Sequence, residues 1–212
     1  MHRLITCTTS LFALMLLASF ALAQAEFSAD IVDLQKQGTP TQARIYSAKD
    51  KMRIESQDQN RDQHNLRGMG VVIMDMAKQS FTVLMTQQRM YMEVPSQAME
   101  QRGLYSFFRT GDVENACTDW QKMPHNQGGT CRKVGSETVN GRNTVKYEGT
   151  NSSGDQSQVW LDPKLRFPVK WKGKNSEGEL RNIQEGGQPA SLFEIPAGYT
   201  KMDLGGMMQQ HQ

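Results

Sequence analysis

The sequence has few cysteines, no excess of charge of either sign and, after its first residues, no long apolar run. It contains 3 cysteines, 24 Lys and Arg against 22 Asp and Glu, and a formal net charge of +2. A near-neutral chain lacks the basic footprint of a general nucleic-acid-binding protein, so we expect no nucleic acid partner. Beyond residue 23 no stretch approaches the ~20 apolar residues that a membrane-spanning helix needs.

Catalytic motifs are also missing. We find no serine-hydrolase elbow, zinc-protease helix, phosphate loop, dinucleotide fingerprint or calcium loop. His64, His125 and His211 are isolated in polar contexts, which is typical of surface histidines. Met207 and Met208 beside His211 are soft-metal ligand types, but we interpret this segment as a disordered tail. We therefore predict a protein that is not an enzyme, with no catalytic residue, no cofactor and no metal.

The N-terminus has the three-part pattern of a secretion signal. A basic start is followed by an apolar run and by Ala21-Leu22-Ala23, and cleavage after Ala23 or after Ala25 satisfies the small-residue rule. We predict a signal peptide over 1–23, one domain over 26–204 and a disordered tail over 205–212. The mature protein is expected to be exported and soluble.

Removal of Cys7 with the signal leaves Cys117 and Cys131. An even pair in an exported chain predicts one disulfide, and the Cys-x-x-Cys spacing of a redox enzyme is absent. Closing a loop of this length stabilises a fold by roughly 3 kcal/mol in the chain-entropy model.

The fold class predicted from the pattern is mainly β with minor α, a curved antiparallel sheet. Turn signals recur about every eight to twelve residues, and Asn140-Gly141 predicts a hairpin turn. We predict one helix, at Gln97–Phe108, and a loop or short irregular insert from Thr110 to Thr130. The predicted strands are Phe27–Leu34, Gln42–Ser47, Lys51–Ser56, Gly70–Met76, Ser80–Thr86, Arg89–Val94, Arg132–Val139, Asn143–Thr150, Gln158–Leu161, Lys164–Lys174 and Glu179–Glu185.

Three strands of the first half, Gly70–Met76, Phe81–Met85 and Met90–Val94, are apolar on both faces and must be covered on both. A single predicted helix can cover one of these faces but not the other, so the pattern indicates a cavity on the uncovered face. Methionines suit a surface that repacks around varied apolar ligands. The alternative is a methionine-rich core closed by loops. The candidate ligand-binding residues are Met74, Met76, Leu84, Met90, Met92, Phe108 and Trp171.

The strand Lys164–Lys174 alternates cleanly. Leu165, Phe167, Val169 and Trp171 occupy one face and are expected to be buried, and Pro168 predicts an edge position or a bend. The other face carries a basic stripe of three lysines: Lys170, Lys172 and Lys174. Such a stripe is typical of a solvated face that blocks strand pairing, and it also suits an anionic membrane surface or an acidic partner.

Several short motifs resemble a known family. They are Gln158–Lys164 with its Leu-Asp-Pro turn, Phe167–Lys170, Gly178–Arg181, Ala190–Tyr199, Phe27–Asp30, Ile45-Tyr46 and Asp50–Glu55. Together they are similar to the LolA-like superfamily of periplasmic lipoprotein carriers. In detail, the Lys-Met-Arg phrase at 51–53 and Tyr91-Met-Glu93 resemble the family of unknown function DUF4412. The resemblance implies an incomplete antiparallel β-barrel with a helix packed on its concave side, a pocket for acyl chains and a periplasmic location.

Two functions remain open from the sequence. One is a periplasmic carrier-like protein that binds a lipid or an acylated protein in a half-barrel cavity without converting it. The other is an envelope interaction or structural module with a self-filled core, which acts through its basic strand and sheet edges. An empty apolar pocket of several hundred Å³ would favour the carrier.

Overall fold

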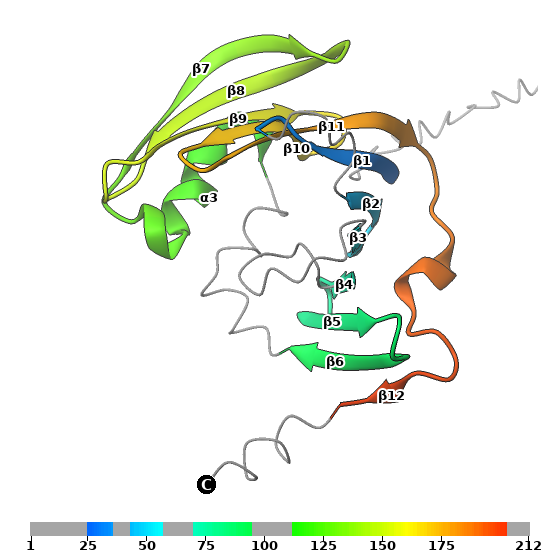
Figure 1. Ribbon diagram of the computed structural model, residues 1–212. Coiled ribbons are helices and arrows are strands. Elements are labelled where there is room, and N and C mark those ends of the chain that lie inside the picture. Colours follow the sequence, from blue (N-terminus) through cyan, green and yellow to red (C-terminus); the bar gives the residue numbers. More distant parts are fainter. Residues whose placement is uncertain (1–24, 36–42, 57–69, 95–111, 203–212) are drawn as a thin grey trace, which may run out of the picture.

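The computed structural model describes residues 25–35, 43–56, 70–94 and 112–202. The predicted signal peptide, the helix at 97–108 with its Phe108, and the tail from 205 lie outside the described residues and stay predictions. Element labels follow Figure 1.

The described residues build a 12-stranded sheet in the order β12-β6-β5-β4-β3-β2-β1-β11-β10-β9-β8-β7. Two antiparallel meanders, β1–β6 and β7–β11, are joined by the pairing of β1 with β11. The strand bounds are β1 Phe27–Asp33, β2 Ala43–Ala48, β3 Lys51–Ser56, β4 Val71–Asp75, β5 Ser80–Met85, β6 Met90–Val94, β7 Thr130–Val139, β8 Arg142–Thr150, β9 Gln156–Asp162, β10 Phe167–Gly173, β11 Ser176–Glu185 and β12 Thr200–Lys201.

The sheet is strongly curved and does not close, as Figure 1 shows. The predicted fold class is confirmed: the chain is mainly β, with one unclosed, curved sheet. The main core lines one continuous face, which runs from Leu180 through Phe27 and Ile45 to Met74 and Phe81. Directly opposed residues such as Ile45 and Ile54 lie on the same face of a sheet, so this core follows the strand register.

The segment predicted as a loop or irregular insert is helical, which corrects that expectation. It contains η1 (Val113–Asn115), α3 (Ala116–Lys122) and η2 (Pro124–Asn126). The Asp112 side chain caps η1 by accepting from the Glu114 N–H at 2.9 Å. α3 is the one α-helix among the described residues, and it lies on the concave side beneath the β7–β11 part of the sheet (Figure 1).

Each predicted strand exists, with ends shifted by up to about three residues. The predicted Asn140-Gly141 hairpin turn is confirmed, because both residues have positive φ, 48° and 78°, as this tight turn requires. The two-residue β12 was not predicted. It is too short to have an alternation of its own, and it exists through parallel pairing with β6.

The strand predicted at Lys164–Lys174 begins later, at Phe167. Leu165, Phe167 and Val169 are buried as predicted, whereas Trp171 is only partly buried. The register shifts between Pro168 and Lys170, so Pro168 marks a bulge. The bend expected for Pro168 is therefore correct and the edge position is wrong, because β10 lies between β9 and β11.

The Leu-Asp-Pro turn before β10 is organised by one buried carboxylate. Asp162 accepts from the backbone N–H groups of Lys164 at 2.8 Å and Leu165 at 3.0 Å, and it pairs with the Arg142 guanidinium. Arg142 also contacts Glu185 at 2.8 Å. A buried charge needs such partners, so the motif has a structural role in closing the β9–β10 turn.

The second apolar face of β4 and β5 is covered by the C-terminal segment. Phe193 in η3 (Ala190–Phe193) packs with Val71, Ile73 and Leu84. The Arg53 guanidinium donates to the Leu192 carbonyl at 2.9 Å and holds η3 against the sheet. The C-terminal segment of the chain therefore covers this second apolar face, for which the sequence offered no covering element.

Candidate functional site

An apolar groove lies between α3 and the concave face of β8–β10. Its volume is about 290 Å³. Its floor consists of side chains on one face of three neighbouring strands, since Tyr147 and Trp171 both oppose Val159 in the register. The residues that line it are Ala116, Asp119, Trp120, Met123, Asn126, Cys131, Tyr147, Glu148, Gly149, Ser157, Gln158, Val159, Leu161, Pro168, Trp171, Lys172, Gly173 and Ser176.

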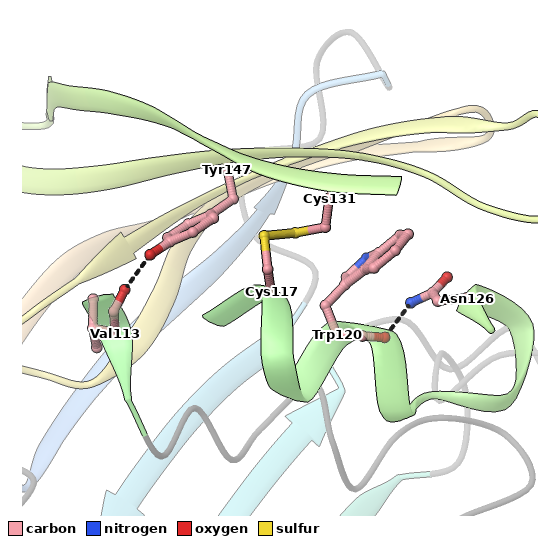
Figure 2. The surroundings of a disulfide bond; sticks show 6 residues. All are labelled: Val113, Cys117, Trp120, Asn126, Cys131 and Tyr147. Carbon is pink, nitrogen blue, oxygen red and sulfur yellow. Dashed lines mark hydrogen bonds between the residues drawn. A yellow bond between two sulfur atoms is a disulfide. The ribbon is translucent and has the colours of Figure 1, made fainter. Parts of the chain in front are cut away.

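A disulfide ties the roof of the groove to the sheet. Cys117 on α3 and Cys131 on β7 are joined with their Cα atoms 5.5 Å apart, which is the pairing the sequence predicted (Figure 2). The buried Tyr147 hydroxyl donates to the Val113 carbonyl at 2.8 Å. Burial raises the pKa of Tyr147, so this hydroxyl stays protonated and keeps its donor role at neutral pH.

Two of the three tryptophans of the chain face the groove, and each packs over a glycine. A Cβ atom at Gly149 would lie 2.6 Å from Cζ2 of Trp120, and one at Gly178 would lie 2.5 Å from Cζ2 of Trp171. Any larger residue would displace the indoles. Glycine at these two strand positions therefore lets Trp120 lie close to β8 and Trp171 close to β11.

The roof ends where Asn126 donates from Nδ2 to the Trp120 carbonyl at 3.1 Å (Figure 2). The same carbonyl also accepts from the Met123 backbone N–H at 3.2 Å, so both bonds close the last turn of α3. Trp120 therefore has its backbone held by η2 and its ring held by Gly149. These two contacts fix the position of Trp120 at the end of the roof.

Of the predicted ligand-binding residues that the structure describes, only Trp171 lines this groove. Met74 is buried in the main core, and Met76 and Met92 pack against it. Leu84 lies on the opposite face against Phe193, and Met90 is partly buried on β6. The structure therefore brings Met74, Met76, Met92 and Trp171 to one cluster and leaves Leu84 and Met90 outside it. The ligand-binding role of these residues stays a prediction. Phe108 lies outside the described residues.

The sequence reasoning missed the helical roof, including Trp120 and Met123. The available signal was a tryptophan and a methionine inside a polar segment between two cysteines. An aromatic residue in such a segment indicates packing against the domain, because a solvated loop has no use for it. His125 in η2 is exposed, as expected for a surface histidine.

The basic stripe is largely neutralised. Lys172 pairs with Glu177 at 3.1 Å, and Lys174 pairs with Asp155 at 2.7 Å. Lys170 lies over the Trp160 ring with its Nζ 5.0 Å from the centroid. Glu177 on β11 and Asp155 just before β9 thus offset Lys172 and Lys174, as on a solvated face.

Within 25–35, 43–56, 70–94 and 112–202, no group of three or more His, Cys, Asp and Glu residues is arranged to hold a metal ion. The helices among these residues are all too short or too polar to cross a membrane.

No family model matches the chain. No curated protein is significantly similar to it in sequence. The resemblance to DUF4412 therefore has no support beyond the motifs themselves.

Solved structures with similar folds do exist. An uncharacterized conserved protein from Thermus thermophilus matches with a TM-score of 0.50 at 9% identity, over 85% of this chain and 91% of that one. The Pseudomonas aeruginosa MucA/MucB complex matches at 0.47 and 17%, over 84% of this chain but 57% of that one. The LolA superfamily protein NE2245 from Nitrosomonas europaea matches at 0.31 and 9%, over 81% and 90%. At such identities the first likeness shows the fold alone, and the other two carry no further argument.

Proposed function

We propose that this protein is an exported carrier-like protein that binds the acyl chain of a lipid or acylated protein between α3 and β8–β10, without converting it. The observation that carries the proposal is the apolar groove of about 290 Å³, close to the lower end of ligand pockets in general. Each methylene that enters such a groove contributes about 0.8 kcal/mol.

Two features of the groove favour binding over catalysis. The roof is held by the Cys117–Cys131 disulfide and by the Tyr147 hydroxyl, so little ordering is needed when a ligand enters. The lining contains serines and carboxylates but no histidine or free cysteine. A serine nucleophile needs an adjacent base, and this lining offers no imidazole for that role.

The test uses the tryptophans as internal reporters. Trp120 and Trp171 line the groove, whereas Trp160 lies on the opposite face of β9 with its indole N–H donating to Glu137 at 2.8 Å. Brominated fatty acyl chains quench a nearby indole. Trp120→Phe and Trp171→Phe should each reduce this quenching, and the matched control Trp160→Phe should leave it unchanged. The same protein, purified from its native compartment, should carry lipid in native mass spectrometry. No quenching together with no co-purified lipid would remove the carrier function.

A second candidate is the envelope interaction module, favoured by the edge at β7. This ten-residue strand ends the strand order of the described sheet, and its Val134 is 46% exposed. Exposed edges can pair with a strand of another protein. Photo-crosslinking from Val134 in cells distinguishes the two: a defined protein adduct with an unloaded groove favours the module, and a lipid-loaded groove without adducts favours the carrier.

A further inference from the structure

Two of the charged residues that line the groove, Glu148 and Lys172, have their side chains on the opposite face of the sheet. Side chains alternate along a strand, so Glu148 and Lys172 face away from the side on which Tyr147 and Trp171 form the floor. Glu148 pairs there with Arg132 at 2.6 Å and also accepts from the Gln158 amide at 2.9 Å.

The remaining charged lining residue is anionic. Asp119 on α3 pairs with Lys122 at 3.0 Å, and the Lys172 amino group is 3.1 Å from Glu177 on the outer face. Among the lining residues that belong to the described part of the chain, no cation faces the interior of the groove. An ionised carboxylate or phosphate inside would therefore lack the partner that a buried charge requires.

The polar groups that do face the groove are neutral. Ser157 shares the face of Val159 on β9, and Ser176 opposes Gly173 at the start of β11. Asn126 contributes an amide at the end of the roof. Hydroxyl and amide groups can donate to or accept from an uncharged headgroup without the desolvation cost of an ion.

We propose that the groove selects amphiphiles with an uncharged, hydroxyl-bearing headgroup, such as a monoacylglycerol, over anionic lipids with the same chain. This inference rests on the proposed function and names its ligand class. The acyl chain lies between the two indoles, and the headgroup lies at the end of the groove formed by Ser157 and Ser176. The Asp119 carboxylate, the charged lining residue on α3, supplies no positive charge for an anionic headgroup.

The experiment is displacement of a fluorescent acyl probe at neutral pH by monoolein and by oleate, which share one chain. Monoolein should displace the probe at about tenfold lower concentration than oleate, with both below their aggregation thresholds. Ser157→Lys replaces a headgroup hydroxyl by a cation, so it should strengthen oleate by about fivefold and weaken monoolein, which raises the ratio of oleate affinity to monoolein affinity by more than about fivefold. Glu93→Gln, on β6 and outside the lining, is the matched control and should change neither ligand.

The outcomes separate this inference from the proposed function. If oleate binds as tightly as monoolein and Ser157→Lys leaves their ratio unchanged, the headgroup selection is overturned while acyl binding stands. If neither ligand displaces the probe, or the probe does not bind, the proposed function itself fails and the selection fails with it. Circular dichroism of each variant shows whether it is folded.

Discussion

The half of the sheet formed by β2–β6 and the half formed by β7–β11 differ in what lies on their two faces. In the first half both faces are apolar and both are filled: Met74 and Phe81 belong to the main core, and Leu84 packs under Phe193 of the C-terminal segment. In the second half the outer face is covered with ion pairs such as Lys172–Glu177, and the inner face forms the groove.

The difference shows what makes a cavity in this fold. Strands that are apolar on both faces do not by themselves indicate a bound ligand, because here a short C-terminal segment buries Val71, Ile73 and Leu84 on the second face. The groove arises where the cover is a single short helix of seven residues, held at its first turn by a disulfide. A short cover held at one end leaves part of the apolar floor unfilled.

The largest expected effect comes from Leu84→Ala. Leu84 lies on β5 and is fully buried under Phe193 of η3. Its replacement by Ala should therefore lower the free energy of unfolding by about 2 to 5 kcal/mol. Probe affinity of the folded variant should be unchanged, because the site is on the other half. Urea unfolding and probe titration measure the two quantities. A variant that kept its stability but lost probe binding would place a ligand site in the first half.

The disulfide should contribute nearly as much, and here binding should also change. Replacing Cys117 and Cys131 together by Ala should destabilise the protein by roughly 3 kcal/mol, through the entropy of the unfolded chain. Because α3 is the roof of the groove, probe affinity should fall too. Peptide mapping without reductant should show the two cysteine peptides joined in the native protein. Two free thiols, or an unchanged melting temperature, would contradict the assignment.

A glycine pair gives a sharper local test within the second half. Gly149→Ala should push the Trp120 ring out of place and weaken probe binding by about tenfold, at a stability cost of about 1 to 3 kcal/mol. Gly187→Ala is the control, because Gly187 is not among the lining residues and its Cβ would meet only a Glu26 carboxylate oxygen, at 3.6 Å. Equal effects of the two substitutions would show that the ring position is irrelevant to the groove.

The smallest effect is expected on the outer face. Replacing Lys170, Lys172 and Lys174 by Gln should change stability by about 1 kcal/mol or less per lost ion pair. Because neighbouring carboxylates already offset these charges, co-sedimentation with anionic vesicles should be weak and equal for both proteins at low and moderate salt. A salt-dependent loss of vesicle binding in the variant would instead identify the stripe as a membrane contact.

The sequence located the strands well because a strand with one buried face leaves a period of two in the residues. The alternation of Leu165, Phe167 and Val169 predicted their burial correctly. Pro168 indicated a bend or an edge position, but the alternation could not predict that the register of β10 shifts there or that Trp171 lines the groove. The cysteine pairing was also predictable, since only two cysteines remain after Cys7 is removed.

The candidate site was far less predictable. Most of the candidate residues were chosen because they lie on strands that are apolar on both faces, yet Met74 and Leu84 point to opposite faces of the folded sheet. Trp120 and Gly149 are distant in sequence and meet only because the disulfide brings α3 over β8. Local patterns contain no information about such a contact.

By itself the sequence determined a mainly β domain, its strands, its hairpin turn and its disulfide, because these depend on periodicity, turn chemistry and a simple count of cysteines. Only the tertiary structure decided which apolar surface is filled and which is left as a groove. That outcome depends on where the curved sheet places α3 and the C-terminal segment relative to the strands, and the curvature arises from the summed twist of twelve strands, not from any one of them.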